Sequence, residues 1–139
     1  MGKILYFEDI EAWQSAHELA RRVYRVTKAG AFARDFALRD QIRRAAISAA
    51  SNIAEGFESR TTPLFVDFLG RAKASAGEVR SQLHLARCEG YVDENTFNEL
   101  SQLALSVSRQ ISGFTKCLER HSNRKRPEAP SRRPLKARP

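Results

Sequence analysis

Residues that usually build catalytic and metal sites are scarce in this sequence. The two cysteines, Cys88 and Cys117, lie 29 residues apart, without the close pairing that is typical of a zinc or redox site. No glutamate stands three positions before His17, His84 or His121, so the Glu-x-x-His motif of di-iron helical bundles is absent. We therefore expect no metal site and no cofactor.

Glycine is also sparse, and its seven positions are scattered along the chain. None of them forms the glycine-rich loop with which many proteins hold a nucleotide phosphate. The sequence also singles out no cysteine or serine placed against a histidine for nucleophilic catalysis. We therefore expect a protein that is not an enzyme.

Long apolar runs are missing as well. No stretch approaches the roughly 20 apolar residues of a membrane span. The N-terminus reaches the acidic Glu8, Asp9 and Glu11 without the apolar core of a signal peptide. These features predict a cytoplasmic protein that does not contact a membrane.

Proline is absent from residues 1–62 and 64–126, so both stretches can form long helices. Apolar residues recur there at helical spacings of three and four, whereas the alternation typical of strands is absent. We predict an all-α fold, an antiparallel up-down four-helix bundle that spans residues 1–121. Its helices are expected at about residues 9–29, 37–58, 62–89 and 93–120.

Local signals support these boundaries. Asp9 is a candidate N-cap for the first helix, Thr61 or Thr62 for the third, and Asp93 for the fourth, while Gly90 is a candidate left-handed C-cap. In the first helix, the predicted core stripe consists of Trp13, Ala16, Ala20, Val23 and Thr27. The fourth helix has the most regular stripe, formed by Phe97, Leu100, Ala104, Val107, Ile111, Phe114 and Leu118.

The second helix has an alanine-rich apolar face and ends near Gly56. This glycine indicates either a close contact with a neighbouring helix or a C-terminal cap. The same helix carries side chains at spacings of three and four that are all polar, and we call them the polar row: Gln41, Arg44, Ser48, Asn52 and Glu55. The polar row is a solvated face, a buried network between helices or a contact between subunits, and all three interpretations stay open.

Positive charge is distributed unevenly within the net charge of +8. Residues 122–139 hold seven basic side chains against Glu128 alone, a net +6, whereas the other 121 residues hold 17 basic and 15 acidic side chains. The same C-terminal segment contains four prolines and almost no large apolar residue. We predict that residues 122–139 form a disordered Arg/Pro-rich tail, because burial there cannot offset the entropy of ordering the chain.

Clustered basic residues are the usual contacts of proteins with nucleic-acid phosphates. In the folded part, the candidates are expected on the exposed side of the helices: Arg21, Arg25, Arg39 and Arg43. The tail adds Arg124, Lys125, Arg126, Arg132, Arg133, Lys136 and Arg138. The alternative is that all of these are solvated charges and that the tail only aids solubility.

Two segments of the second helix carry a resemblance to a known family. The run Leu-Arg-Asp-Gln-Ile-Arg-Arg-Ala-Ala-Ile-Ser at residues 38–48, followed by Ser-Asn-Ile-Ala-Glu-Gly-Phe at residues 51–57, resembles the signature of bacterial four-helix bundle proteins labelled 23S ribosomal RNA intervening-sequence proteins. The similarity extends to residues 7–19 and 68–83 and ends near His121.

The resemblance implies a homopentamer of four-helix bundles without enzymatic activity. The family includes the accessory variability determinant of diversity-generating retroelements, which binds nucleic acid and a reverse transcriptase. RNA or DNA, and a protein partner such as a reverse transcriptase, are therefore the partners that the resemblance implies.

Two functional hypotheses follow. The first is a non-enzymatic oligomeric nucleic-acid-binding accessory protein, in which several copies multiply the phosphate contacts. The second is a protein–protein assembly or adaptor module with no intrinsic nucleic-acid binding, in which the polar row is an interface.

Overall fold

The computed structural model describes residues 3–125 of the 139-residue chain. These residues form a 3₁₀ helix and five α-helices, in the order η1 (Phe7–Asp9), α1 (Glu11–Thr27), α2 (Gly30–Arg34), α3 (Phe36–Phe57), α4 (Thr62–Cys88) and α5 (Glu94–Lys125). No strand occurs within this range. The predicted all-α class is therefore confirmed for residues 3–125.

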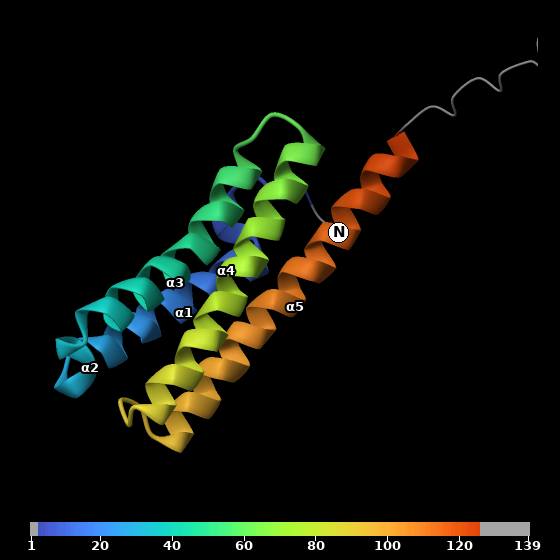
Figure 1. Cartoon of the computed structure of the whole chain (residues 1–139). Helices are drawn as coiled ribbons and strands as arrows, with labels where there is room; N and C mark the ends of the chain where they lie inside the picture. Colours follow the sequence, from blue (N-terminus) through green and yellow to red (C-terminus); the bar gives the residue numbers. More distant parts are fainter. Residues whose placement is uncertain (1–2, 126–139) are drawn as a thin grey trace, which may run out of the picture.

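The four long helices lie side by side, and the short α2 caps one end of the molecule (Figure 1). Helix α3 packs against α1 and α4, and α5 packs against the same two helices. Each long helix therefore has two neighbours among the other three, and their inward faces enclose a single apolar core. Among the helices of residues 3–125, none combines the length and apolarity needed to cross a bilayer.

Large apolar side chains from all four long helices are fully buried, among them Leu19, Ile42, Leu69, Leu83 and Ile111. Burying one such side chain contributes about 1.5–3 kcal/mol to the free energy of unfolding. Alanines fill much of the space between them, with Ala45, Ala46, Ala49, Ala72, Ala76 and Ala86 all buried. Small side chains at these positions let α3 and α4 approach closely, which favours packing density over buried area.

Gly56 lies in this close α3–α4 contact. A Cβ atom added at Gly56 would lie 2.8 Å from Phe68 Cβ and 3.4 Å from the Phe65 carbonyl oxygen. Glu58, and not Gly56, is the C-cap of α3. The close-contact interpretation of Gly56 is therefore the one that holds.

Three of the predicted caps are confirmed. The Thr61 side chain accepts a hydrogen bond from the Leu64 N–H at 3.3 Å, and the Asp93 carboxylate accepts one from the Thr96 N–H at 2.7 Å. Gly90 adopts φ +73°, the left-handed conformation expected for a residue that ends a helix.

The N-cap predicted at Asp9 is wrong. Asp9 belongs to η1, and α1 begins two residues later, after Ile10, whose position makes no side-chain cap hydrogen bond. Ile10 is 2% exposed. Apolar packing, and not a capping carboxylate, therefore anchors the start of α1.

The stretch between the helices expected at residues 9–29 and 37–58 is largely helical, since α2 spans Gly30–Arg34. Gly30, the first residue of α2, has φ +69°, and Phe32 is buried, with its ring stacked 5.2 Å from that of Tyr91. Asp35 then caps α3 by accepting a hydrogen bond from the Leu38 N–H, and it accepts a second from the Tyr91 hydroxyl at 2.8 Å. This pair ties the start of α3 to the turn between α4 and α5.

Helix α5 continues to Lys125, whereas the sequence predicted its end near residue 120 and a disordered tail from Ser122. The helix end predicted near residue 120 is therefore too early. No proline interrupts the chain before Pro127, and cationic side chains near the C-terminus of a helix interact favourably with its dipole. The remainder of the predicted tail, residues 126–139, lies outside the described residues.

Candidate nucleic-acid interface

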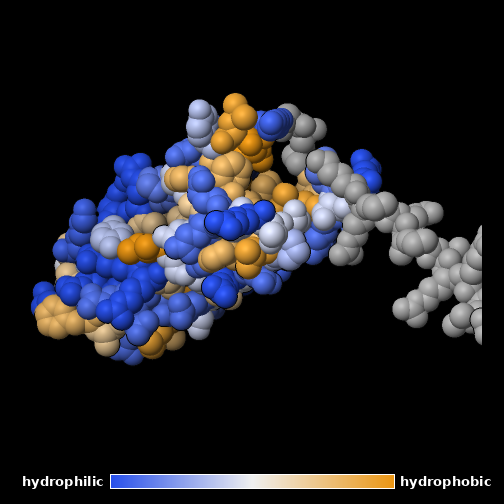
Figure 2. Space-filling model, turned by 90° about the horizontal axis from the view of Figure 1, so that it is seen from above, coloured by the Kyte–Doolittle hydropathy of each residue, from blue (hydrophilic) through white to orange (hydrophobic). Residues whose placement is uncertain are grey.

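Basic residues gather at the end of the molecule that carries α2. Residues 21–44 hold only two acidic side chains, Asp35 and Asp40, against eight basic ones: Arg21, Arg22, Arg25, Lys28, Arg34, Arg39, Arg43 and Arg44. This segment covers the C-terminal half of α1, all of α2 and the first turns of α3. Figure 2 shows that the surface in the left half of its view, the side on which α2 lies in Figure 1, is mostly hydrophilic. The near-neutral folded part therefore contains a strongly basic segment, while the α4–α5 turn at the same end of the molecule carries the acidic Glu89, Asp93 and Glu94.

A groove of about 660 Å³ lies between α1 and α3 beside this basic segment, and we call it the α1–α3 groove. Its floor is made of small half-buried side chains, Ala20 on α1 and Ala50 and Ala54 on α3. Because alanine fills little space between two helices, the surface is hollowed along this line. Ile47, which is 42% exposed, borders the groove on α3.

Aromatic side chains line one half of the α1–α3 groove. Trp13 and His17, one turn apart on α1, are stacked with ring centroids 4.9 Å apart and an interplanar angle of 15°. Phe7 contacts Trp13 edge-on at 5.1 Å. Tyr24 lies further along α1, and the Arg43 guanidinium covers its ring at 4.6 Å. We call these rings the aromatic edge, and their contacts with one another and with Arg43 fix their orientation.

Cationic side chains line the groove toward the C-terminus of α1, on both sides of Tyr24: Arg21, Arg25 and Lys28. Arg21 is exposed and lies 3.6 Å from the Glu18 carboxylate. No ion pair within residues 3–125 involves Arg25 or Lys28. The described lining residues include no carboxylate, so the charged side chains that line the groove are all positive.

Glu18 is the carboxylate nearest to these cations along α1, and it is already paired. Arg22 Nε donates a hydrogen bond to it at 3.1 Å. This hydrogen bond, with the charges of Arg21, Arg22 and Arg25, holds the pKa of Glu18 below its usual range in spite of some desolvation. Glu18 thus stays ionised and offsets part of the positive charge, chiefly that of Arg22.

Two of the four arginines predicted as exposed phosphate contacts are half-buried and engaged within the fold. Arg39 donates hydrogen bonds to Asp40 and to the Ala33 carbonyl, both at 2.9 Å. Arg43 Nε donates to Thr27 Oγ1 at 2.8 Å. The exposure predicted for Arg39 and Arg43 is wrong because both side chains fold back onto polar groups at the ends of α2 and α1. Arg21 and Arg25 are exposed as predicted.

The polar row divides into two parts. Ser48 Oγ accepts hydrogen bonds from Ser75 Oγ on α4 at 2.9 Å and from Asn52 Nδ2 at 2.8 Å, and both Ser48 and Asn52 are half-buried. These two residues therefore form a network between α3 and α4. The other three members, Gln41, Arg44 and Glu55, are exposed.

The basic residues predicted in the tail are described only at its start. Arg124 is exposed in the last turn of α5, and Lys125 is the final residue of that helix. The others lie outside the described residues: Arg126, Arg132, Arg133, Lys136 and Arg138.

The sequence reasoning missed the aromatic half of the groove. Trp13 and Ala20 were assigned to the core stripe of the first helix, but the buried positions are Ala12, Ala16, Leu19, Val23 and Thr27. Helix α1 thus has two adjacent apolar strips, one facing the core and one facing the groove. The two strips can be distinguished only when the position of α3 beside α1 is known. The spacing of apolar residues within α1 does not show where α3 packs.

The fold and the site define a small helical protein with a basic, aromatic-lined groove. The chain belongs to the 23S rRNA-intervening sequence protein family, whose model matches residues 8–113. A solved structure, titled a protein with unknown function from the S23 ribosomal protein family of Bacteroides thetaiotaomicron, is similar in fold. Its TM-score is 0.69 at 19% sequence identity, over 76% of this chain and 98% of that one. No curated protein matches the sequence.

Proposed function

We propose that this protein is a non-enzymatic nucleic-acid-binding protein of its family, and that the α1–α3 groove receives a single strand of RNA or DNA. The observation that carries the proposal is the meeting of three cations and an aromatic edge in one groove whose described lining has no carboxylate. Single-stranded nucleic acids are commonly bound in this way, with cations along the phosphates and aromatic rings against the bases.

The spacing of the cations fits a strand that runs along α1. Arg21, Arg25 and Lys28 follow one another at intervals of four and three residues on one face of the helix, and therefore cover about 10 Å of its length. Successive phosphates of an extended strand can contact successive cations, while exposed bases stack on the Trp13–His17 pair. Each stacked base is worth about 1–3 kcal/mol.

We also propose the antiparallel up-down four-helix bundle as the fold of the long helices and the homopentamer as the assembly. The ring of helix contacts and the short connections between α3, α4 and α5 support the bundle. The resemblance of residues 38–57 to the family signature supports the pentamer. The exposed Gln41, Arg44 and Glu55 are the proposed subunit contacts. Five linked grooves would raise the affinity for a long strand well above that of one groove.

Fluorescence anisotropy with a labelled single-stranded RNA and a duplex DNA, at low and moderate salt, tests the proposed function. We expect the intact chain to bind the single strand more tightly than the duplex. Replacing Arg21 and Arg25 by glutamine should weaken binding by about tenfold or more, since hydrogen bonds to charged groups are worth about 1.5–3 kcal/mol each. Arg80→Gln, at an exposed arginine of α4 outside the groove, is the matched control and should bind as the unaltered chain does.

A chain that ends at Lys125 separates the tail from the groove, and it retains every buried side chain of the described core. Binding that disappears with residues 126–139 but survives the change at Arg21 and Arg25 would assign the activity to the tail and contradict the groove. The absence of salt-sensitive binding in all variants would favour the alternative function, an assembly or adaptor module for a protein such as a reverse transcriptase.

A further inference from the structure

A second hollow lies where α3 ends and α4 begins, and we call it the end pocket. In Figure 1, this end of the helices is opposite α2. Its volume is about 800 Å³, and its apolar lining includes Phe57, Phe65, Phe114 and Leu118. The rings of Phe57 and Phe114 lie 6.3 and 5.5 Å from that of Phe65. Three helices therefore contribute to one apolar wall.

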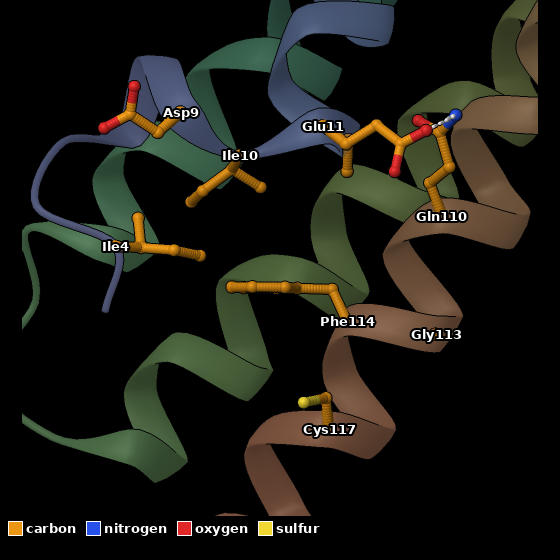
Figure 3. Close-up of a pocket in the computed structure, with 9 residues that line it drawn as sticks. Ile4, Asp9, Ile10, Glu11, Gln110, Gly113, Phe114 and Cys117 are labelled. Atoms are coloured by element: carbon orange, nitrogen blue, oxygen red, sulfur yellow. Dashed lines mark hydrogen bonds between the residues drawn. The ribbon is translucent and has the colours of Figure 1, made fainter. Parts of the chain in front are cut away.

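The apolar surface continues into a neighbouring hollow of about 460 Å³, which shares Ile4, Phe114 and Cys117 with the end pocket. Figure 3 shows the side chains of Ile4, Ile10 and Phe114 pointing toward a common space, with Cys117 further along α5. The two hollows are therefore adjacent, and Phe114 lies between them.

Cations surround the apolar wall of the end pocket. Lys3 comes from the N-terminal segment and Arg120 and Arg124 from the last turns of α5, and His121 lies between them. The described lining of the end pocket itself includes no carboxylate, whereas Asp9 and Glu11 line the neighbouring hollow. An occupant must therefore match an apolar floor and a positive rim.

Three exposed apolar side chains are sequence neighbours of residues that line the pocket. Leu5 and Tyr6, next to Ile4 in the chain, are 63% and 64% exposed, and Leu64, next to Phe65, is 46% exposed. These are three of the six large hydrophobic side chains that are exposed in residues 3–125. A contiguous apolar surface with a polar rim is typical of a protein interaction site.

We propose that the end pocket docks an acidic segment of a partner protein whose large apolar side chains enter the pocket. Carboxylates of such a segment would pair with Lys3, Arg120 and Arg124, and its apolar side chains would cover the phenylalanine wall. A nucleic acid offers the negative charge without aliphatic side chains. Residues 126–139 of this chain carry five basic side chains against one acidic, so the positive rim disfavours them as the occupant.

The two free cysteines supply a built-in test, because Cys117 is half-buried and lines the end pocket while Cys88 is exposed at the far end of α4. The probe is a synthetic amphipathic peptide of glutamate, leucine and tryptophan, added to the full chain, with alkylation of each thiol followed by mass spectrometry. At a peptide concentration about ten times the dissociation constant, the alkylation rate of Cys117 should fall by about tenfold. The alkylation rate of Cys88 should stay unchanged.

Replacing Arg120 and Arg124 together by glutamine should weaken peptide binding by at least about tenfold, with unchanged helicity by circular dichroism. Arg109→Gln, at an exposed arginine of α5 outside the pocket, is the control and should bind the peptide normally. A peptide with lysine in place of every glutamate should neither bind nor protect Cys117.

Equal binding of the lysine peptide, or protection of Cys88 to the same degree as Cys117, would overturn the proposal. So would full protection of Cys117 by palmitate in a chain that does not bind the acidic peptide, since the site would then belong to a small amphiphilic anion. These outcomes are independent of binding in the α1–α3 groove, because the two sites share no lining residue.

Discussion

Gly56 is a position where a single methyl group decides how closely α3 and α4 approach. Alanine there would gain about 1 kcal/mol of helix propensity, but its Cβ would meet Phe68 Cβ at 2.8 Å, and overpacking costs about 1–3 kcal/mol. We expect Gly56→Ala to lower the free energy of unfolding by about 1–2 kcal/mol, measured by urea denaturation.

The control for that change is Gly70→Ala on α4. A Cβ at Gly70 would have no neighbour within 4 Å, so the same substitution should raise the free energy of unfolding by up to about 1 kcal/mol. If Gly56→Ala were also stabilising, the close approach of the two helices at that point would be contradicted.

Ser48 joins α3 to α4 through its hydroxyl, which accepts hydrogen bonds from Ser75 and Asn52. Ser48→Ala should lower the free energy of unfolding by about 1 kcal/mol, because the half-buried Ser75 hydroxyl loses its acceptor. In a double-mutant cycle with Ser75→Ala, we expect a coupling energy of at least about 0.5 kcal/mol. Additive effects of the two substitutions would show that the hydroxyls do not interact in solution.

Individual contacts of this kind were the least predictable part of the site. The sequence places Arg39 and Arg43 on an exposed helical face, but each has a partner that becomes near only after α1, α2 and α3 pack together. The polar row was visible, whereas the partner of Ser48 lies 27 residues away on α4. Periodicity identifies which residues share a face, and it does not identify what that face meets.

At the scale of elements, the hydrogen bond between Tyr91 and Asp35 links the start of α3 to the α4–α5 turn. Hydrogen bonds from the Leu38 N–H and the Tyr91 hydroxyl lower the pKa of Asp35, while the bond to Asp35 raises the pKa of Tyr91. The contribution of Asp35 to stability is therefore complete above its unfolded-state pKa of about 3.9 and is lost as the pH falls through the lower folded-state pKa.

Tyr91→Phe should accordingly raise the pKa of Asp35 and destabilise the protein at neutral pH, with a difference from the unaltered chain that shrinks at acid pH. Tyr91 also contributes to stability, but with the opposite pH dependence. Its contribution is complete below about pH 10 and is lost as the pH rises through the raised pKa. Urea denaturation from pH 2 to 11 and an NMR titration of Asp35 measure both effects. A difference that is constant with pH would contradict the link.

The long helices were the most predictable elements, and the reason differs from one to another. The regular stripe of α5 is buried from Phe97 to Ile111 because one face of a straight helix meets the core throughout. Thr61 and Asp93 cap their helices as the local sequence indicates. Helix α2 was missed because Phe32, and not a periodic pattern, stabilises its single turn against Tyr91.

At the scale of the molecule, the arrangement of charge matters more than its sum. The segment of residues 21–44 has a net charge of +6, and this excess is hidden when it is summed with the acidic residues of the other helices. The signal was present in the sequence, but the groove was not, since it exists only where α1 and α3 pack together. Charge and shape coincide at this face, which is the basis of the proposed nucleic-acid site.

The salt dependence of single-stranded RNA binding tests this central claim most directly. Each phosphate contact contributes a slope of about −0.7 to the plot of log K against log salt concentration for a single strand. Replacing Arg21 and Arg25 by glutamine removes two such contacts from each groove and should make the slope shallower by about 1.4 per bound groove, whereas Arg80→Gln should leave it unchanged. An unchanged slope in the Arg21 and Arg25 variant would contradict the assignment of the α1–α3 groove to nucleic-acid binding.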